Sequence, residues 1–289
     1  MNILIVSDFY PPFIGGAERQ AQLLAKTFTS RGHRVHVATT WHHGLQEYSN
    51  EDGVAIHRIK GLYTSVPWFS KQAGRRYHPP FPDPRMALEL RRLVKTHRID
   101  IVHSSGWIAY SCAAGLIGSK VPLLVSTRDY GYFCAINTFL HQGKVCDGPQ
   151  LTKCFACAGS TYGYVKAAAS VPGVFTFKWL LLSKTAGLHA ISTYVLEQIQ
   201  KYFLSSQKTI KKTIIPSFLE SLDNNPVAND HSRKFLSSLP KEPFILFVGS
   251  LQSHKGIYVL LDAYKKLTSP PPLVLIGTAW PDSPTEYPS

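Results

Sequence analysis

Short apolar runs of strand length alternate along this chain with segments whose apolar residues recur at helical spacing. The first eight residues predict a buried strand, which a loop rich in proline and glycine at residues 9–16 separates from a helix that Gly32 ends. Residues 34–39 predict a second strand. This order of strand, loop, helix and strand is typical of a parallel sheet covered by helices.

The same alternation continues to the end of the chain. Asp83 and Pro84 have the residue types of an N-cap and a first helical position, and Ser192 or Thr193 is placed to cap another helix. We expect residues 130–160 to be irregular and a helical stretch to lead from there to the strand at 187–192, with the apolar run 171–182 broken by Pro172, Gly173 and Lys178. Further strands are expected at 55–59, 100–103, 123–126, 187–192, 212–216, 244–248 and 273–276, and further helices at 108–117 and 256–267.

A polar stretch rich in Ser, Asn, Asp and Pro at residues 219–242 divides the chain. We therefore predict an α/β domain at 1–218, a linker at 219–242 and the beginning of a second α/β domain at 243–289. The chain has 289 residues, of which 44% are hydrophobic and 17% charged, a globular composition that excludes disordered and collagen-like classes. No run of 18 apolar residues and no secretory signal are found, so we expect a cytoplasmic protein.

Two loop motifs give the chain a family resemblance. Residues 9–18 read Phe-Tyr-Pro-Pro-Phe-Ile-Gly-Gly-Ala-Glu, and residues 247–256 contain Phe-Val-Gly-Ser-Leu followed by Lys-Gly. With the segments at 100–103 and 191–192 they stand in an order that resembles the retaining family 4 glycosyltransferases of the GT-B fold. The resemblance implies two Rossmann-like domains, the second one truncated here, and transfer of a sugar from a nucleotide-sugar donor to a glycan or lipid-linked acceptor hydroxyl. It implies no catalytic cofactor, and the departing phosphate would take the acceptor proton.

Five residues are expected to bind the donor. Gly15 and Gly16 precede a helix, where free backbone N–H groups favour an anion, although a tight turn alone would explain them equally well. Glu18 has the alternative of complementing the helix dipole. Gly249 and Lys255 lie between a strand and a helix, and the resemblance places Lys255 on the diphosphate. The family has an arginine after Gly249, whereas Ser250 stands here.

Three residues are candidates for the catalytic site. Arg128 and Asp129 follow a predicted strand, and many relatives have a histidine at the position of Arg128. Because arginine stays protonated, Arg128 would act through its charge on a phosphate or an acceptor. His103 also ends a predicted strand, and a structural, hydrogen-bonded imidazole is its alternative.

Four cysteines lie in one segment. Cys154 and Cys157 have the spacing of half a zinc site, and a subset of the family carries a similar cluster. The four cysteines form either a structural zinc site or, as the alternative, reduced thiols or one local disulfide, and the sequence leaves this open. The four residues are Cys134, Cys146, Cys154 and Cys157.

The net charge of +13 is concentrated between residues 58 and 98, where there are ten basic and two acidic residues. The aromatic residues Trp68, Phe69, Tyr77 and Phe81 are interleaved with them. Basic and aromatic side chains on one face bind anionic bilayers, so we expect peripheral association with the inner face of the plasma membrane, against the alternative of a solvated basic face. Nucleic acid is not expected, because no recognition motif accompanies the charge. The ten are Arg58, Lys60, Lys71, Arg75, Arg76, Arg85, Arg91, Arg92, Lys95 and Arg98.

The resemblance also implies a Glu-x7-Glu donor motif that would lie beyond Ser289. We therefore weigh an active enzyme seen in part against an inactive fragment that binds an acceptor or a partner. An unrelated nucleotide-dependent oxidoreductase is disfavoured, because no Gly-x-Gly-x-x-Gly follows the first strand.

Overall fold

The computed structural model covers the whole chain and describes all residues except 14, 64–75, 205–209, 220–234, 280–282 and 285–289. It divides the chain into two compact units, residues 1–220 and 221–289. The predicted linker lies largely outside the described residues. Each unit is presented by itself below.

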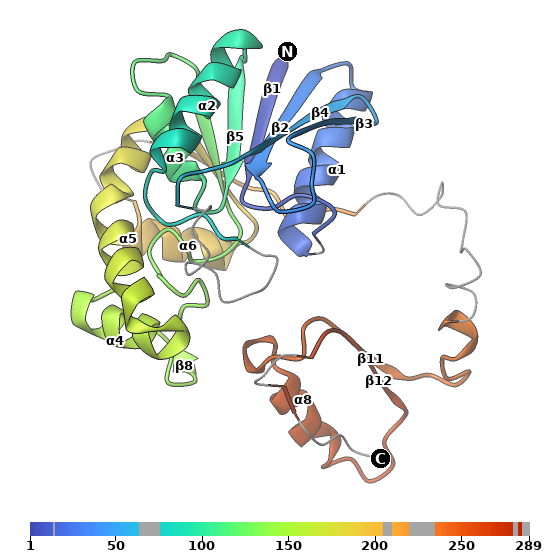
Figure 1. Cartoon of the computed structure of the whole chain (residues 1–289). Helices are drawn as coiled ribbons and strands as arrows, with labels where there is room; N and C mark the ends of the chain where they lie inside the picture. The colour runs from blue at the N-terminus through green and yellow to red at the C-terminus, as the bar shows by residue number, and fades with distance from the viewer. Residues whose placement is uncertain (14, 64–75, 205–209, 220–234, 280–282, 285–289) are drawn as a thin grey trace. The chain divides into compact units, whose positions relative to one another are not determined.

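The first unit is built on an eight-stranded sheet (Figure 1). Its strand order is β10-β9-β6-β5-β1-β2-β4-β3, and every neighbouring pair is parallel except β3 with β4. The carboxyl ends of the parallel strands therefore meet at one edge of the sheet, where α/β folds place their ligand sites.

The elements of this unit follow the predicted alternation of strand and helix. Three strands, β3, β7 and β8, were not predicted. The elements are β1 (Asn2–Ser7), α1 (Gly16–Ser30), β2 (Arg34–Thr40), β3 (Tyr48–Glu51), β4 (Val54–Ile59), α2 (Pro84–Thr96), β5 (Ile101–Ser105), α3 (Ala109–Gly115), β6 (Leu123–Thr127), β7 (Leu140–His141), β8 (Lys144–Val145), α4 (Leu151–Tyr162), α5 (Tyr164–Lys184), β9 (Thr185–Ala190), α6 (Thr193–Tyr202) and β10 (Lys211–Ile214).

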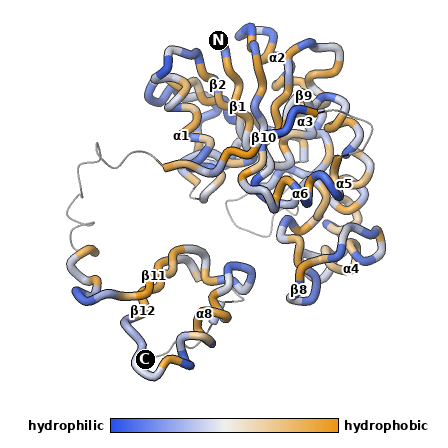
Figure 2. Tube along the Cα trace, turned by 180° about the vertical axis from the view of Figure 1, so that it is seen from behind, coloured by the Kyte–Doolittle hydropathy of each residue, from blue (hydrophilic) through white to orange (hydrophobic). Residues whose placement is uncertain are grey.

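Alternate residues of the strands face two hydrophobic cores. Ile3, Ile5 and Val37 pack with Ala21 and Ala25 of α1 on one face of the sheet. The other face packs against α2, α3 and α5, which Figure 1 shows together on that side. Figure 2 shows β1 as a hydrophobic segment, as expected for a central strand buried on both faces. On the face of the sheet covered by α2, α3 and α5, the core that includes β1 contains Met86, Leu90, Ala109, Ala113 and Leu181 of these helices.

Two predicted helix starts are confirmed by their hydrogen bonds. The Asp83 side chain accepts the Met86 N–H at 3.0 Å, with Pro84 at the first helical position of α2. The Ser192 hydroxyl accepts the Val195 N–H at 3.3 Å at the start of α6. Each bond satisfies one of the backbone donors that a helix leaves free at its amino end.

One prediction about residues 130–182 is wrong, because the segment expected to be irregular contains the helix α4. The expected helical stretch after it is found as α5, which continues through Pro172. Among the described residues α5 is also the one helix whose 21-residue length and apolar composition would suffice to cross a membrane. Part of it is buried within the unit, with Val171 and Val174 in a small core and Leu181 in the large one.

The basic stretch at residues 58–98 is less uniform than its sequence suggests. Arg58 is buried, donates to Gln46 O and Ser49 Oγ, and pairs with Glu51 at 3.3 Å, so it does not belong to a solvated basic face. Lys60 pairs with Glu47. Trp68, Phe69, Lys71 and Arg75 lie outside the described residues.

The second unit contains a parallel pair of strands, β11 (Ile245–Val248) and β12 (Leu273–Ile276). Between them lie a short 3-10 helix, η3 (Ser253–Lys255), and the helix α8 (Ile257–Tyr264). This is the strand, helix and strand order that the sequence predicts for the beginning of a second α/β unit.

Candidate active site

A pocket of about 160 Å³ opens at the carboxyl ends of β1, β5 and β6. Polar groups that follow these strands line it together with the first turn of α1 and the loop after β6. Its position agrees with the general rule that α/β sheets bind ligands at this edge. The charged lining residues among those described are Asp8, Glu18, Arg128 and Asp129, and Asn137 adds a buried side-chain oxygen.

Asp8 is held at the floor of this pocket by the chain that follows β5. Its Oδ2 accepts the Trp107 N–H at 3.0 Å, and its Oδ1 accepts the Ile108 N–H at 2.8 Å. Gly106 has φ +81°, and a Cβ there would lie 2.1 Å from Asp8 Oδ2. The glycine therefore provides both the left-handed turn and the space that the carboxylate occupies.

The removal of Asp8 from water raises its pKa to about 7, and this effect exceeds the opposing one of the two backbone hydrogen bonds. The nearby Asp129 and Glu18 carboxylates raise the pKa further. Asp8 therefore changes its charge near neutral pH, so the pocket loses negative charge on mild acidification.

This shift predicts a pH dependence of stability. Between about pH 4 and pH 7 the folded chain holds a proton on Asp8 that the unfolded chain releases, so the stability that Asp8 contributes in its neutral form is lost as the pH rises. Relative to Asp8→Asn, the wild-type free energy of unfolding should fall by about 4 kcal/mol across this window. Urea unfolding at half-unit pH steps measures it, and curves that stay parallel would contradict it.

Glu18 lines the pocket from the first turn of α1 and is buried. Its side chain bends back over the glycine before the helix, because a Cβ on Gly15 would lie 2.2 Å from Glu18 Oε2. Gly16 has open space where its Cβ would be. Neither glycine is among the lining residues, whereas Ala17 and Glu18 are, so phosphate binding by the two glycines stays a prediction.

Arg128 is the cation among the lining residues that the structure describes. It is half-buried and donates from Nη1 to Ser217 Oγ at 3.3 Å. Partial burial lowers its pKa, but an arginine remains protonated at neutral pH. Asp129 lies beside it and accepts the Gly131 N–H at 2.8 Å. Both predicted residues therefore reach the pocket.

One lining atom is an acceptor without a donor. Asn137 Oδ1 is buried and has no hydrogen-bond partner among the described residues. The neighbouring loop is well fixed, because Trp107 Nε1 donates to Gly131 O at 2.8 Å. A buried polar atom left unpaired at a pocket wall is suited to a ligand that brings a hydroxyl or N–H donor.

His103 lies in β5 and is not among the lining residues. Its Nε2 is buried without a partner in the described part of the chain, and its ring centroid lies 6.2 Å from that of His189. Burial chiefly, with the charges of His189 and Arg128, lowers the pKa of His103 to about 3. The imidazole is therefore neutral at pH 7, and a direct role for it stays a prediction.

The second unit carries the other two predicted donor residues. Gly249 follows β11, and Lys255 ends η3 directly before Gly256, which caps α8 in a left-handed conformation with φ +82°. Lys255 is exposed. The predicted placement of a lysine between a strand and a helix is found, while its contact with a phosphate stays a prediction.

The four clustered cysteines are free thiols on α4 and on the loops before it. Burial raises the pKa of Cys134 to about 11 and also raises that of Cys154, so both are protonated at neutral pH. Among the described residues, the group whose metal-binding atoms lie within 4.8 Å of one another consists of histidines and includes no cysteine. A structural zinc at the cysteines stays a prediction.

Sequence reasoning missed Asp8, Trp107 and Asn137. A signal for Asp8 exists, since it follows the first strand as Arg128 follows β6, and parallel strands bring such positions together. Asn137 carries no comparable signal, because its place in the pocket depends on the loop after β6.

Comparisons with known proteins assign this fold. The family described as Glycosyltransferase Family 4 matches residues 14–210, which include the pocket except for Ser7, Asp8 and Phe9. A Klebsiella pneumoniae protein described as an uncharacterized 42.6 kDa protein in the cps region is 29% identical over 140 residues, which are 45% of this chain and 37% of that protein.

Solved structures are similar over nearly the whole chain. A sucrose-phosphate synthase from Thermosynechococcus elongatus has a TM-score of 0.63 at 14% identity, over 97% of this chain and 63% of that one. A glycosyltransferase from Rickettsia africae has a TM-score of 0.55 at 14% identity, over 96% of this chain and 60% of that one. The catalytic domain of starch synthase IV from Arabidopsis thaliana, bound to ADP and acarbose, has a TM-score of 0.52 at 14% identity, over 96% of this chain and 68% of that one. These similarities confirm the predicted α/β fold of GT-B type. The chain spans less than two thirds of the first two structures.

Proposed function

The chain belongs to Glycosyltransferase Family 4, and on this premise we propose that it takes part in transferring a sugar from a nucleotide-sugar donor to an acceptor hydroxyl with retention of configuration. The observation that carries the proposal is the pocket at the carboxyl ends of β1, β5 and β6, most of whose lining residues lie in the part of the chain that the family matches. Starch synthase IV, which shares the fold, was solved with a nucleoside diphosphate, and this supports a nucleotide-linked donor.

The chemistry of the pocket favours a hydroxyl-rich acceptor. Its described lining residues include three carboxylates, those of Asp8, Glu18 and Asp129, and one guanidinium, that of Arg128. Carboxylates and the unpaired Asn137 oxygen accept hydrogen bonds from hydroxyl groups, whereas Arg128 is the one described lining side chain with a positive charge to pair with a phosphate. We therefore propose that Glu18 contacts sugar hydroxyls rather than phosphate, and that the acceptor is a glycan or a lipid-linked sugar. The description of the Klebsiella relative as a protein of the cps region is compatible with such an acceptor.

Positive charge for the leaving diphosphate is proposed to come from two residues. Lys255, exposed before α8, is the candidate in the second unit, and Arg128 is the candidate in the first. Fixed cations aimed at a developing negative charge lower the barrier of such a transfer. The departing phosphate then takes the acceptor proton, so no residue has to act as the base.

The test is an assay of the full chain with a panel of UDP-, GDP-, ADP- and dTDP-linked sugars and oligosaccharide or lipid-linked acceptors. Release of nucleoside diphosphate together with a product that keeps the anomeric configuration of the donor, read by NMR, is the expected result. If no donor is bound or consumed while an acceptor binds, the chain is a binding module and the proposal is wrong.

We also propose that the chain acts in the cytoplasm and binds the inner face of the plasma membrane through the basic residues of α2 and its flanks. Arg85 and Arg92 are exposed on this helix. Juxtaposed cations contribute about 1 kcal/mol each at an anionic surface. Co-sedimentation with vesicles containing 30–40% phosphatidylglycerol, roughly the charge needed for such binding, should fall on Arg85→Gln/Arg92→Gln substitution. Equal sedimentation of the variant and the wild type would contradict it.

A further inference from the structure

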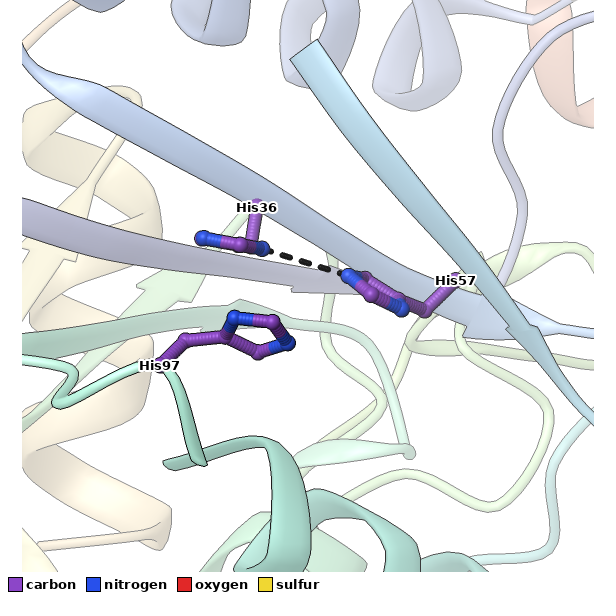
Figure 3. Close-up of side chains that lie close together, drawn as sticks. All are labelled: His36, His57 and His97. Atoms are coloured by element: carbon purple, nitrogen blue, oxygen red, sulfur yellow. Dashed lines mark hydrogen bonds between the residues drawn. The ribbon is translucent and has the colours of Figure 1, made fainter. Parts of the chain in front are cut away.

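Three histidines from distant parts of the sequence meet on one face of the large sheet (Figure 3). His36 lies in β2, His57 in β4, and His97 directly follows α2. One nitrogen from each ring lies within 4.8 Å of the others. All three side chains are half-buried, which leaves the group accessible to a small ion.

The sheet itself brings the first two rings together. In the parallel pairing of β2 with β4, His36 lies opposite Ala55 and His57 lies opposite Ala38, so the two histidines share a face and have alanines as their neighbours. The small alanines leave room for both rings. His36 Nδ1 and His57 Nε2 lie 3.2 Å apart, the dashed contact in Figure 3.

The third ring is positioned by the end of α2. The Asn2 side chain in β1 donates to His97 O at 3.1 Å and to Arg98 O at 3.0 Å. The ring centroids of His36 and His97 lie 4.1 Å apart. His97 is thus tied to the sheet through its backbone, while its ring can rotate toward the other two.

From this geometry we propose that His36, His57 and His97 bind one Zn²⁺ ion through three imidazole nitrogens, with a fourth position open to water. Tetrahedral zinc with Zn–N bonds of about 2.0 Å requires nitrogens about 3.3 Å apart. The pair of His36 and His57 already has this spacing, and a rotation of the His97 ring brings its nitrogen to the third position.

The protonation state of the group suits a cation. Burial, together with the neighbouring histidines, lowers the pKa of His36 and lowers that of His57 to about 4, so these two rings are neutral at pH 7. Each neutral ring carries its proton on one of two nitrogens. Moving that proton to the far nitrogen frees the lone pair toward the ion without a change of charge. Imidazole donors suit zinc, copper and nickel rather than magnesium or calcium.

This site is separate from the proposed active site. It lies near the amino end of β2 and in the middle of β4, and it shares no residue with the pocket, which lies at the carboxyl ends of β1, β5 and β6. The ion would therefore link β2, β4 and the end of α2, and it would stabilise the first unit without entering the transfer reaction.

The experiment uses the full chain without a histidine tag, freed of metal by a chelator and titrated with Zn²⁺ against a chromophoric competitor. We expect one equivalent to bind with a dissociation constant of about 1 μM or lower, and His57→Gln or His97→Gln to weaken this binding at least tenfold, as expected when one of three ligands is removed. His141→Gln is the matched control, since His141 is also half-buried but lies in β7, outside the group. Zn²⁺ should raise the melting temperature of the wild type and of this control, but not that of His57→Gln.

The cysteine cluster offers a competing zinc site, so a Cys154→Ser/Cys157→Ser variant is titrated in parallel. It should retain the binding that the histidine variants lose. Binding that disappears in the cysteine variant and persists in His57→Gln and His97→Gln, or no binding at 100 μM free Zn²⁺, about a hundredfold above the expected constant, would overturn the proposal. Circular dichroism of the metal-free variants verifies that each one is folded.

Discussion

Replacing Gly106 by alanine is expected to lower the free energy of unfolding by about 3–8 kcal/mol and to abolish ligand binding in the pocket. The alanine must adopt φ +81°, which costs about 1–2 kcal/mol for an L-residue. Its Cβ would also lie 2.1 Å from Asp8 Oδ2, so the carboxylate has to move. The Trp107 and Ile108 N–H groups then lose their acceptor, at about 1–3 kcal/mol for each buried donor left unpaired.

A second glycine separates the two effects. Gly118 follows α3 with φ +77° and has no atom within 4 Å of the position of its Cβ. Gly118→Ala therefore carries the backbone strain alone and should lose about 1–2 kcal/mol. Urea unfolding of both variants at pH 7 measures the difference. Equal losses would show that Asp8 is not held as the geometry indicates.

The parts of the fold that the sequence predicted are those with local causes. Asp83 and Ser192 cap their helices because the hydrogen-bonded N–H lies three residues away, within the predicted segment. Pro172 breaks the apolar run without ending the helix, although a proline inside a helix costs about 3 kcal/mol. In α5 that penalty is offset by the burial of Val171 and Val174 on either side of it, a tertiary contact that spacing along the chain does not show.

The candidate site divides in the same way. Arg128 and Asp129 were found because they directly follow a strand and belong to a recognisable segment. Asp8 also follows a strand, but its role depends on the Trp107 and Ile108 amides, about a hundred residues further along. Its raised pKa is a consequence of the folded surroundings, so no pattern in the first eight residues could have predicted it.

Arg128→Gln is expected to reduce kcat/KM for sugar transfer by about 10²–10³-fold while leaving the fold intact, if the proposed function holds. Arg128 is the cation among the described lining residues, against three carboxylates. Without it the described lining residues carry no positive charge with which to orient an acceptor or to neutralise a departing phosphate. Arg128→Lys keeps the charge but loses the planar fork of donors, so its activity should lie between the two.

Two readouts distinguish a charge effect from damage to the structure. Arg91→Gln is a matched control, because Arg91 is also half-buried and also donates a single bond, to Ile117 O at 2.8 Å, outside the pocket. It should keep full activity with a soluble acceptor. The Arg128 cation contributes, after burial, to the lowered pKa of His103 and of His189. In Arg128→Gln both pKa values should therefore rise, and NMR titration of the imidazole signals measures this. If activity is lost without that rise, the electrostatic effect of Arg128 does not explain the loss. A cation that acts through its charge in the pocket must also act on the two histidines whose pKa values it lowers.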